Sequence, residues 1–463
     1  MYLSKNGCVS NPVCIGHYPT TLYVINKKDN GYGSLRFVVD NAKPGDTIRF
    51  ADSLIIGGSD TINLLSTIKI NKEVTIVGLY NSSDTLFISG NSTFPVLSAD
   101  LHGLSRKDLW IDSLSIINGN SAGNTNIYIL NNGGAIYFDG DTISIKNSLF
   151  RNNSSPRDAG AIYSKGKYME ISGSKFENNI ATNKGGAIKT DQVTHLMKIE
   201  DSKFYGNSAN QGGAIYCYSY LSSSISSSSY SRIQFSNSEL TNNSSILEGG
   251  GIFLYSRRSV GTSYVNTRNI YSNTRITFDN SIVSNNIAGK DGGAVYSYTY
   301  GLGKSAVSGT PNTYSEIIAN KCTIKNNRSN RHGGAFYSFS DSYTGNLNVA
   351  SVLIDSCMIM NNEAIGDGGV IYSLSDAWAA PGYSKVGIKN TVLKFNKANQ
   401  NGGAIFNNDT RVSQTLTESS FFYKNQAINN GGAINTGDFV SYNSTFEDNE
   451  SLFNGGAVFA VDM

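Results

Sequence analysis

The sequence of 463 residues contains little charge and only 2 Trp and 7 Pro. Its 37 Lys+Arg are balanced by 35 Asp+Glu, and charged residues make up 16 % of the chain. Binding to nucleic acid or to an anionic membrane requires a strong positive field, so we expect neither partner. No apolar run approaches the roughly 20 residues that span a bilayer, which predicts no membrane insertion within this segment.

Histidine and cysteine are also scarce, with 4 His and 5 Cys. The histidines have no metal-ligand spacing, and no phosphate-binding glycine loop or Ser-His-Asp pattern occurs, so we expect no metal and no cofactor. The odd number of cysteines argues against a disulfide framework. Cys8 and Cys14 lie in a separate N-terminal segment, residues 1–22, which polar residues interrupt, so it lacks the apolar stretch of a signal peptide.

The abundant residues are glycine, with 48 copies, and Asn, Ser and Tyr, the last with 27 copies. This composition indicates short strands joined by turns and excludes a helical bundle. A Gly-Gly-small-aliphatic motif recurs along two thirds of the chain. Its eleven copies begin at Gly133, Ala159, Gly185, Gly212, Gly249, Gly292, Gly333, Gly368, Gly402, Gly431 and Gly455.

A second motif, a large apolar residue followed three positions later by Asn, precedes each of the last ten copies. The distance from the apolar residue to the next Gly-Gly is nine positions in every copy except one, where it is eight. The ten pairs are Phe150/Asn153, Phe176/Asn179, Phe204/Asn207, Leu240/Asn243, Val283/Asn286, Ile324/Asn327, Ile359/Asn362, Leu393/Asn396, Phe422/Asn425 and Phe446/Asn449.

Apolar residues alternate with polar ones before this second motif, as at Ile143 and Ile145, which is typical of a strand with one buried face. The units before Phe422 and Phe446 slip by one residue, so their register is less defined. About three short strands fit in each unit, and such units bury their apolar faces only by stacking on one another. The pattern predicts an all-β protein, a right-handed parallel β-helix.

The repeated Asn is expected to stack as a ladder from coil to coil, because Asn tolerates a left-handed backbone and bonds to neighbouring amides. A column of small residues, mostly Ser, lies two positions before the apolar residue. Cys322 and Cys357 replace Ser in this column in successive coils. We interpret them as a packed pair of thiols rather than a disulfide or metal site.

The paired motifs resemble the GGAI and FxxN repeats of the chlamydial polymorphic membrane proteins. GGAI is intact at Gly133 and four later copies, and FxxN is intact at Phe150 and four later copies. Separately, Gly33-Ser34-Leu35-Arg36 and the segments that follow it resemble the N-terminal part of the CSLREA class of secreted β-helix proteins. These resemblances imply a cell-surface or extracellular protein whose open end is capped by the N-terminal part.

The cap is consistent with the local sequence. Ser34 is a favourable helix N-cap, and Leu35, Val38, Val39 and Ala42 share one face of a short helix. We therefore divide the chain into the N-terminal segment 1–22, the cap and first coils 23–132, and the repeat β-helix 133–463. The chain stops a few residues after the last Gly-Gly, so we expect the array to be cut in mid-coil.

The middle coils are longer than the others. Successive Gly-Gly copies lie 24 to 29 residues apart at both ends of the array and 34 to 43 apart between Gly212 and Gly402. The extra residues, within 216–391, are rich in Tyr and Ser. We expect them to form loops on one side of the helix, where Tyr and Ser favour adaptable binding surfaces.

An aromatic residue follows the buried aliphatic residue of most Gly-Gly strands and is expected to point outward. Such a column could hold a sugar chain or a partner protein. The alternative is that the inserted loops fold over the column and bury it as a satellite core. The candidate ligand-binding residues are Tyr216, Tyr218, Phe253, Tyr296, Tyr298, Tyr337 and Tyr372.

Glu248, Asp291, His332 and Asp367 precede Gly-Gly in four successive coils, so stacking would align them. Such a column could bind a cation or perform acid/base chemistry on a glycan. The residue type varies widely at this position in the other coils, which favours a solvated turn position instead.

Three functions fit these patterns. The first is an adhesin-like surface protein, a monomeric rod that binds a glycan or a partner protein. The second is a polysaccharide lyase or hydrolase, supported mainly by analogy with other β-helices, which is weak support. The third is a structural spacer. We favour adhesion and assign no catalytic residue.

Overall fold

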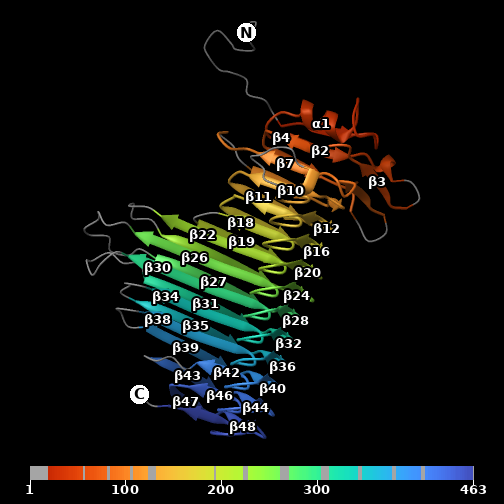
Figure 1. Cartoon of the computed structure of the whole chain (residues 1–463). Coiled ribbons are helices and arrows are strands. Elements are labelled where there is room, and N and C mark those ends of the chain that lie inside the picture. The colour runs from red at the N-terminus through yellow and green to blue at the C-terminus, as the bar shows by residue number, and fades with distance from the viewer. Residues whose placement is uncertain are drawn as a thin grey trace.

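The structure is a computed structural model in which strands wind into a parallel β-helix (Figure 1). Nearly every strand pairs in parallel with its counterpart one coil away, so four sheets run along the helix axis. The predicted fold class is therefore confirmed. The structure describes residues 19–55, 58–80, 84–104, 108–123, 132–191, 194–222, 228–260, 271–303, 312–342, 347–377, 382–407 and 412–461.

Sheet 1 has 14 strands and holds the alternating segments that precede the apolar-Asn motif. Its strands are β1 (Thr21–Val24), β2 (Thr47–Phe50), β5 (Val74–Val77), β8 (Asp108–Asp112), β11 (Thr142–Lys146), β15 (Tyr168–Ser172), β19 (Thr194–Glu200), β23 (Ser229–Ser236), β27 (Tyr271–Asp279), β31 (Asn312–Asn320), β35 (Asn348–Asp355), β39 (Gly382–Lys389), β43 (Ser413–Glu418) and β47 (Asp438–Tyr442).

Sheet 2 has 13 strands, most of them centred on the large apolar residue of the apolar-Asn motif. Its strands are β3 (Asp60–Asn63), β6 (Leu86–Ser89), β9 (Ser115–Ile117), β12 (Leu149–Arg151), β16 (Lys175–Glu177), β20 (Lys203–Tyr205), β24 (Glu239–Thr241), β28 (Ile282–Ser284), β32 (Thr323–Lys325), β36 (Met358–Met360), β40 (Val392–Lys394), β44 (Phe421–Tyr423) and β48 (Thr445–Glu447).

Sheet 3 consists of ten strands of two residues each, which lie between the Asn and the Gly-Gly motif. The repeat coils thus contain four strands, one more than the sequence suggested. An Ala or Ser at the second, inward position of each of these strands allows a short extended step inside the turn. The strands are β13 (Ser154–Ser155), β17 (Ile180–Ala181), β21 (Ser208–Ala209), β25 (Ser244–Ser245), β29 (Ile287–Ala288), β33 (Arg328–Ser329), β37 (Glu363–Ala364), β41 (Lys397–Ala398), β45 (Gln426–Ala427) and β49 (Glu450–Ser451).

Sheet 4 has 13 strands, and in the repeat each begins at the aliphatic residue of the Gly-Gly motif or beside it. Its strands are β4 (Ile68–Ile70), β7 (Leu97–Asp100), β10 (Ile136–Asp139), β14 (Ile162–Ser164), β18 (Ile188–Asp191), β22 (Ile215–Ser222), β26 (Ile252–Val260), β30 (Val295–Gly303), β34 (Phe336–Ser342), β38 (Ile371–Ala377), β42 (Ile405–Asn407), β46 (Ile434–Thr436) and β50 (Val458–Ala460).

The interior of the coils is filled by columns of like residues. The rings of Phe150, Phe176 and Phe204 stack with centroids 4.8 and 4.7 Å apart, and all three are fully buried. Ile143 and Ile145 of β11 face the same interior and are also fully buried. Since each coil repeats the residue type of its neighbour at the same register, the core is one continuous cluster along the axis.

The predicted Asn ladder is present, but its backbone conformation differs from the prediction. The left-handed residue is the one before the ladder Asn: Asn152 and Asn178 have φ of 56° and 54°. Asn153 and Asn179 themselves lack positive φ and are fully buried. Two adjacent positions of the turn therefore have different roles: the first adopts the left-handed backbone conformation, and the second supplies the buried side chain of the ladder.

The two positions of the Gly-Gly motif favour very small residues for different reasons. Gly333 has φ of +66°, in the left-handed region. Gly334 lies so close to the next coil that a Cβ atom would be 2.0 Å from the carbonyl oxygen of Gly369. This close approach explains why only very small residues occur there.

Cys322 and Cys357 replace Ser in the small-residue column, as predicted. In the serine coils the hydroxyl of one residue accepts the backbone N–H of its counterpart, as Ser174 does from Ser148 at 3.1 Å. Here Cys357 Sγ accepts the backbone N–H of Cys322 at 3.2 Å, and both thiols are free and buried. Cys8 and Cys14 lie outside the described residues.

Helix α1 (Leu35–Asn41), the short helix that the sequence predicts, lies at the N-terminal end of the β-helix (Figure 1). Ser34 Oγ accepts the backbone N–H of Phe37 at 3.2 Å and begins the helix. Leu35 and Val39 are buried in the same cluster that fills the coils. The helix therefore covers the first coil with its apolar face.

The described residues also include two short 3-10 turns. The first, η1 (Asp52–Leu54), follows β2, and the second, η2 (Ser121–Gly123), precedes the first Gly-Gly copy.

The middle insertions do not form only loops, as the sequence suggested. They largely lengthen the strands of sheets 4 and 1, which run out together from the coils as a two-layered extension (Figure 1). We call this extension the fin; it comprises the outer ends of β22, β26, β30, β34 and β38 and of β23, β27, β31, β35 and β39. Strands of 7 to 9 residues form it, and most strands of these two sheets in the other coils have 3 to 6 residues.

Small hydroxyl residues fill the space between the two layers of the fin. In β27 the interior positions change from Phe278 and Ile276 in the coil to Thr274 and Ser272 in the fin. Ser297 and Ser315 share a hydrogen bond of 2.8 Å across the layers. The buried interior residues include Ser219, Ser229, Ser231, Ser256, Ser272, Thr274, Ser297, Thr299, Thr313, Ser315, Ser338, Ser340, Ser373, Ser375 and Ser384.

Near the C-terminal end the register is maintained although the hydrophobic pattern slips. In β43, Thr415 and Thr417 occupy the interior positions, and Leu416 is 39 % exposed. Thr415 Oγ1 and Thr436 Oγ1 share a hydrogen bond of 2.9 Å, which satisfies the buried hydroxyls. Within the described part of the chain no helix is long and apolar enough to span a membrane.

Candidate functional site

The outer face of sheet 4 over the fin carries three columns of side chains, formed by residues two apart along each strand. The first column contains Tyr216, Phe253, Tyr296, Tyr337, Tyr372 and Phe406 in register. The second contains Tyr218, Tyr255, Tyr298, Phe339 and Leu374, and the third contains Tyr220, Arg257, Tyr300, Asp341 and Asp376. All seven candidate ligand-binding residues lie in the first two columns.

The rings of the first column are stacked like slabs along the helix axis. Tyr296 and Tyr337 have centroids 4.7 Å apart and ring planes 11° apart, and the other neighbouring pairs are similar. Each ring face is therefore covered by the ring of the next coil. The column presents ring edges and hydroxyl groups, and not ring faces, to the outside.

The first column is less exposed than expected. Tyr216, Phe253 and Tyr337 are only 3 to 7 % exposed, whereas Tyr296 and Tyr372 are intermediate. Their neighbours bury them: Lys184 lies 4.9 Å over the Tyr216 ring, and the His332 ring lies 4.7 Å from that of Tyr372. Most of this column is thus a satellite core on the outer face. Its neighbours are the stacked rings and the turn residues, while the insertions continue outward as strands.

Burial has a direct electrostatic effect on these phenols. It raises the pKa of Tyr296 and Tyr337 well above the ordinary value, and nearby carboxylates add to the effect. In the second column, burial raises the pKa of Tyr255 to about 12. These hydroxyls are therefore neutral hydrogen-bonding groups at any physiological pH.

The outer two columns are more accessible. Tyr220 is 39 % exposed, and Tyr218 and Tyr298 are partly exposed. The Arg257 guanidinium lies between the rings of Tyr220 and Tyr300, 5.3 and 5.4 Å from their centroids. Among the described residues no carboxylate pairs with Arg257, so this sandwich is a cationic centre held by aromatic faces.

Tyr255, Arg257 and Phe339 also belong to this face, although the sequence pattern did not predict them. The signal was available: the period of two continues past the Gly-Gly strand, as at Tyr296, Tyr298 and Tyr300. The intervening Ser and Thr made this stretch look like a loop. They are instead the interior residues of a strand that packs on another sheet.

The acidic column lies beside the aromatic one, and it is not a solvated turn position as we expected. Asp291 is 2 % exposed, and Arg331 Nε and a terminal nitrogen donate to its two carboxylate oxygens at 3.0 and 2.7 Å. The backbone N–H of His332 donates to Asp291 at 3.0 Å. Burial still raises the pKa of Asp291 despite the adjacent arginine.

The rest of this column is also used for contacts between coils. His332 Nδ1 accepts the backbone N–H of Asp367 at 3.1 Å, and Asp367 accepts the side-chain amide of Asn401 at 2.8 Å. Glu248 accepts from the Gln211 amide at 2.8 Å. These groups tie successive turns together. No group of three or more His, Cys, Asp or Glu in the described ranges is arranged to hold a metal ion.

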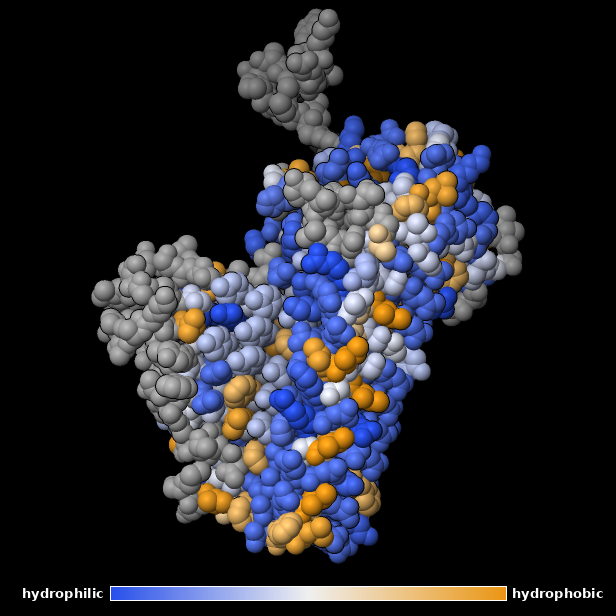
Figure 2. All heavy atoms as spheres, viewed as in Figure 1, coloured by the Kyte–Doolittle hydropathy of each residue, from blue (hydrophilic) through white to orange (hydrophobic). Residues whose placement is uncertain are grey.

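The remaining surface in view has no continuous apolar area. Figure 2 shows hydrophobic residues in small separate groups on a mostly hydrophilic face. Such groups are normal for a surface and do not by themselves mark an interface.

The repeat of this chain matches that of a known family. The model of the Chlamydia polymorphic membrane protein repeat matches residues 147–165, 173–191, 201–218 and 280–298, which span the apolar-Asn and Gly-Gly motifs. This match confirms the resemblance to the GGAI and FxxN repeats. No curated protein matches significantly.

Among solved structures, a PL6 family alginate lyase, AlyGC, is similar at 9 % sequence identity over 94 % of this chain and 80 % of that chain. The TM-score is 0.26, which is too low to support an argument about function.

Proposed function

We propose that this chain, which carries repeats of the Chlamydia polymorphic membrane protein type, is an adhesin-like protein of the cell surface or extracellular space. In this proposal it acts as a monomeric β-helical rod and binds a partner protein through the outer face of the fin. The observation that carries the proposal is the Tyr220–Arg257–Tyr300 sandwich beside partly exposed tyrosines. Tyr and Arg are among the residues enriched at the energetic centres of protein interfaces.

The stacking of the first column favours a protein over a glycan at this face. A sugar ring binds an aromatic side chain through the flat face of the ring, and these faces are covered in the first column. Edges and hydroxyls suit hydrogen bonding to a polypeptide. In this proposal Tyr218, Tyr298 and the residues of the third column contact the partner, and the stacked first column beside them supports their positions.

Catalysis has less support. A general acid or base needs a carboxyl that is free to exchange a proton with the substrate. Both oxygens of Asp291 are engaged by Arg331, and Asp367 is engaged by Asn401. The acidic column is better explained as a set of bonds between coils, so a lyase or hydrolase is not our proposal.

The test is an array of purified extracellular proteins and glycans probed with the full chain, run beside a reducing-end release assay on the same glycans. We expect saturable binding to a protein that falls at least tenfold in Tyr220→Ala/Arg257→Ala/Tyr300→Ala. Tyr205→Ala, at an exposed tyrosine of sheet 2, is the matched control and should bind normally. Release of reducing ends, or unchanged binding by the triple variant, would refute the proposal.

A further inference from the structure

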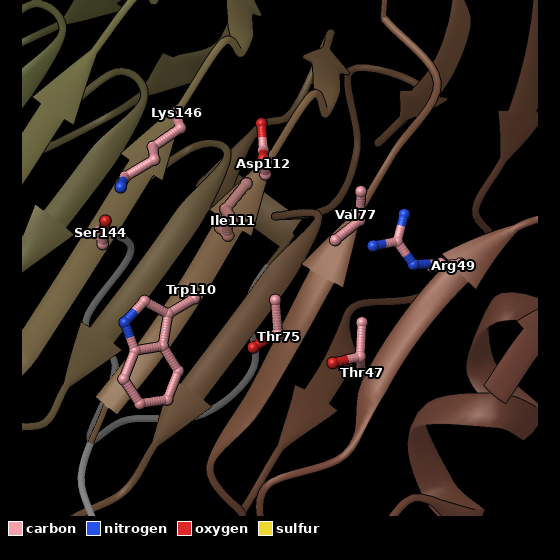
Figure 3. Close-up of a pocket in the computed structure, with 9 residues that line it drawn as sticks. All are labelled: Thr47, Arg49, Thr75, Val77, Trp110, Ile111, Asp112, Ser144 and Lys146. Atoms are coloured by element: carbon pink, nitrogen blue, oxygen red, sulfur yellow. The ribbon is translucent and has the colours of Figure 1, made fainter. Parts of the chain in front are cut away.

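A depression of 470 Å³ lies on the outer face of sheet 1, where β2, β5, β8 and β11 run side by side (Figure 3). It belongs to the cap and first coils and lies outside the fin. Trp110 of β8 is in its floor, between Thr75 of β5 and Ser144 of β11 in the same register. One step along the strands, Arg49, Asp112 and Lys146 form a second row.

Trp110 differs from the aromatic residues of the fin because its ring faces are not covered by other rings. No aromatic ring or cation stacks on it among the described residues, and its in-register neighbours are small. The side chain is partly exposed. A flat, electron-rich surface flanked by hydroxyl groups is the arrangement that stacks against the C–H face of a pyranose ring.

The lining of the depression carries two positive charges, on Arg49 and Lys146, and one negative charge, on Asp112. In the described part of the chain, neither Arg49 nor Lys146 has an ion pair or a side-chain hydrogen bond, and both are exposed. Asp112 is already engaged, since the Asn147 amide and the Ser113 hydroxyl donate to it at 3.1 and 3.0 Å. The two cations are therefore available to a ligand.

The spacing of the cations sets the size of the ligand. Adjacent strands lie about 4.8 Å apart, so Arg49 and Lys146, three strands apart, are separated by about 14 Å at the backbone. A short chain of sugars stacked on Trp110 and carrying acidic groups on two of its sugars matches this separation, with each cation paired to its own anion. On the next strand, β15, Glu170 pairs with Ser144, and its negative charge ends the cationic region on the β11 side.

We propose that this depression binds an acidic oligosaccharide, with one sugar ring stacked on Trp110 and its carboxylate or sulfate groups paired with Arg49 and Lys146. Carboxylated and sulfated chains share this chemistry. The site is separate from the fin and does not depend on the function proposed there.

The test is isothermal titration calorimetry of the full chain with three hexasaccharides: carboxylated hyaluronan, sulfated heparin and neutral maltohexaose. We expect binding of one or both acidic probes at least tenfold tighter than of maltohexaose, with affinity falling as salt increases. Which acidic probe binds identifies the preferred anion. The chain has only 2 Trp, so quenching of fluorescence that is lost in Trp110→Phe would locate the ligand.

Two variants and two controls complete the design. Trp110→Ala and the pair Arg49→Gln/Lys146→Gln should each weaken binding at least tenfold, and the pair should also remove the salt dependence. Lys385→Gln, on the outer face of the same sheet, and the fin variant Tyr220→Ala should bind normally. Equal binding of maltohexaose, unchanged binding by the variants, or no binding of any probe would overturn the proposal.

Discussion

The side chain of Asn286 donates to Asn327 Oδ1 at 3.0 Å, and the backbone N–H of Asn286 donates to the same oxygen at 3.0 Å. The other amide hydrogen reaches the carbonyl of Leu240 at 2.9 Å. One Asn thus connects three coils, and its own oxygen accepts two bonds from Asn243. Every hydrogen-bonding group of this buried side chain is satisfied, which is how a polar column can occupy a dry interior.

Replacement of Asn286 by Ala should therefore lower the free energy of unfolding by about 1 to 3 kcal/mol, because buried partners in two neighbouring coils lose their bonds. Urea denaturation followed by circular dichroism measures this change. Asn183→Ala, at an exposed turn position, is the control and should stay within about 0.5 kcal/mol of the parent. An unchanged midpoint for Asn286→Ala would mean that the ladder does not contribute to stability.

Gly334→Ala should be one of the most damaging substitutions in the chain. The new methyl group would meet the Gly369 carbonyl at 2.0 Å, and both are backbone positions of tightly stacked coils. We expect a loss of about 3 kcal/mol or more, seen as a lowered thermal midpoint or insoluble protein. Gly387→Ala, whose methyl would meet only the Leu353 side chain at 3.0 Å, should be tolerated. Equal behaviour of the two variants would disprove this account.

The interior of the fin should reject large side chains. Ser315 is fully buried and bonds to Ser297 and Ser338 across the two layers. Ser315→Leu should therefore lower the free energy of unfolding by about 1 to 3 kcal/mol through overpacking and loss of these bonds. Ser244→Leu is the matched control, since Ser244 is exposed and Ile287 occupies the same place one coil later. Chemical denaturation gives the free energy of unfolding of both variants. Equal values would contradict the prediction that the fin interior rejects large side chains.

The sequence was sufficient to predict the coils because their chemistry repeats. Phe150, Asn153 and Gly160 have fixed roles in a turn of constant length, so the same letters recur wherever the backbone needs them. The fin was missed because its interior positions are Ser297 and Ser315. Hydrophobic periodicity predicts strands that bury apolar residues. It does not predict a pair of sheets whose interior is filled by hydroxyl groups.

The character of the candidate site could be predicted only in part. The alignment of Tyr296 with Tyr337 followed from the repeat, but the degree to which each ring covers the next depends on the angle of stacking. The burial of Asp291 was equally hidden, because it comes from Arg331 on the next coil. Side-chain contacts between coils depend on the strand register and on the rotamers of both residues. The sequence alone does not give these rotamers.

The tyrosine columns should make the protein sensitive to alkali. Burial raises the pKa of Tyr255 to about 12, from an ordinary value near 10. Because folding favours the neutral phenol, its contribution to stability is complete below about pH 10 and is lost as the pH rises toward 12. We expect the urea midpoint to be constant between pH 7 and 9 and to fall steeply above pH 10.

Tyr255→Phe removes one such phenol and keeps the ring, as Phe253 and Phe339 do nearby. The urea midpoint of this variant should therefore fall less above pH 10 than that of the parent. Tyr442→Phe, at a 59 % exposed position, should follow the parent curve. If Tyr255→Phe and the parent lose stability equally between pH 10 and 12, the phenols of this face do not control the alkaline transition.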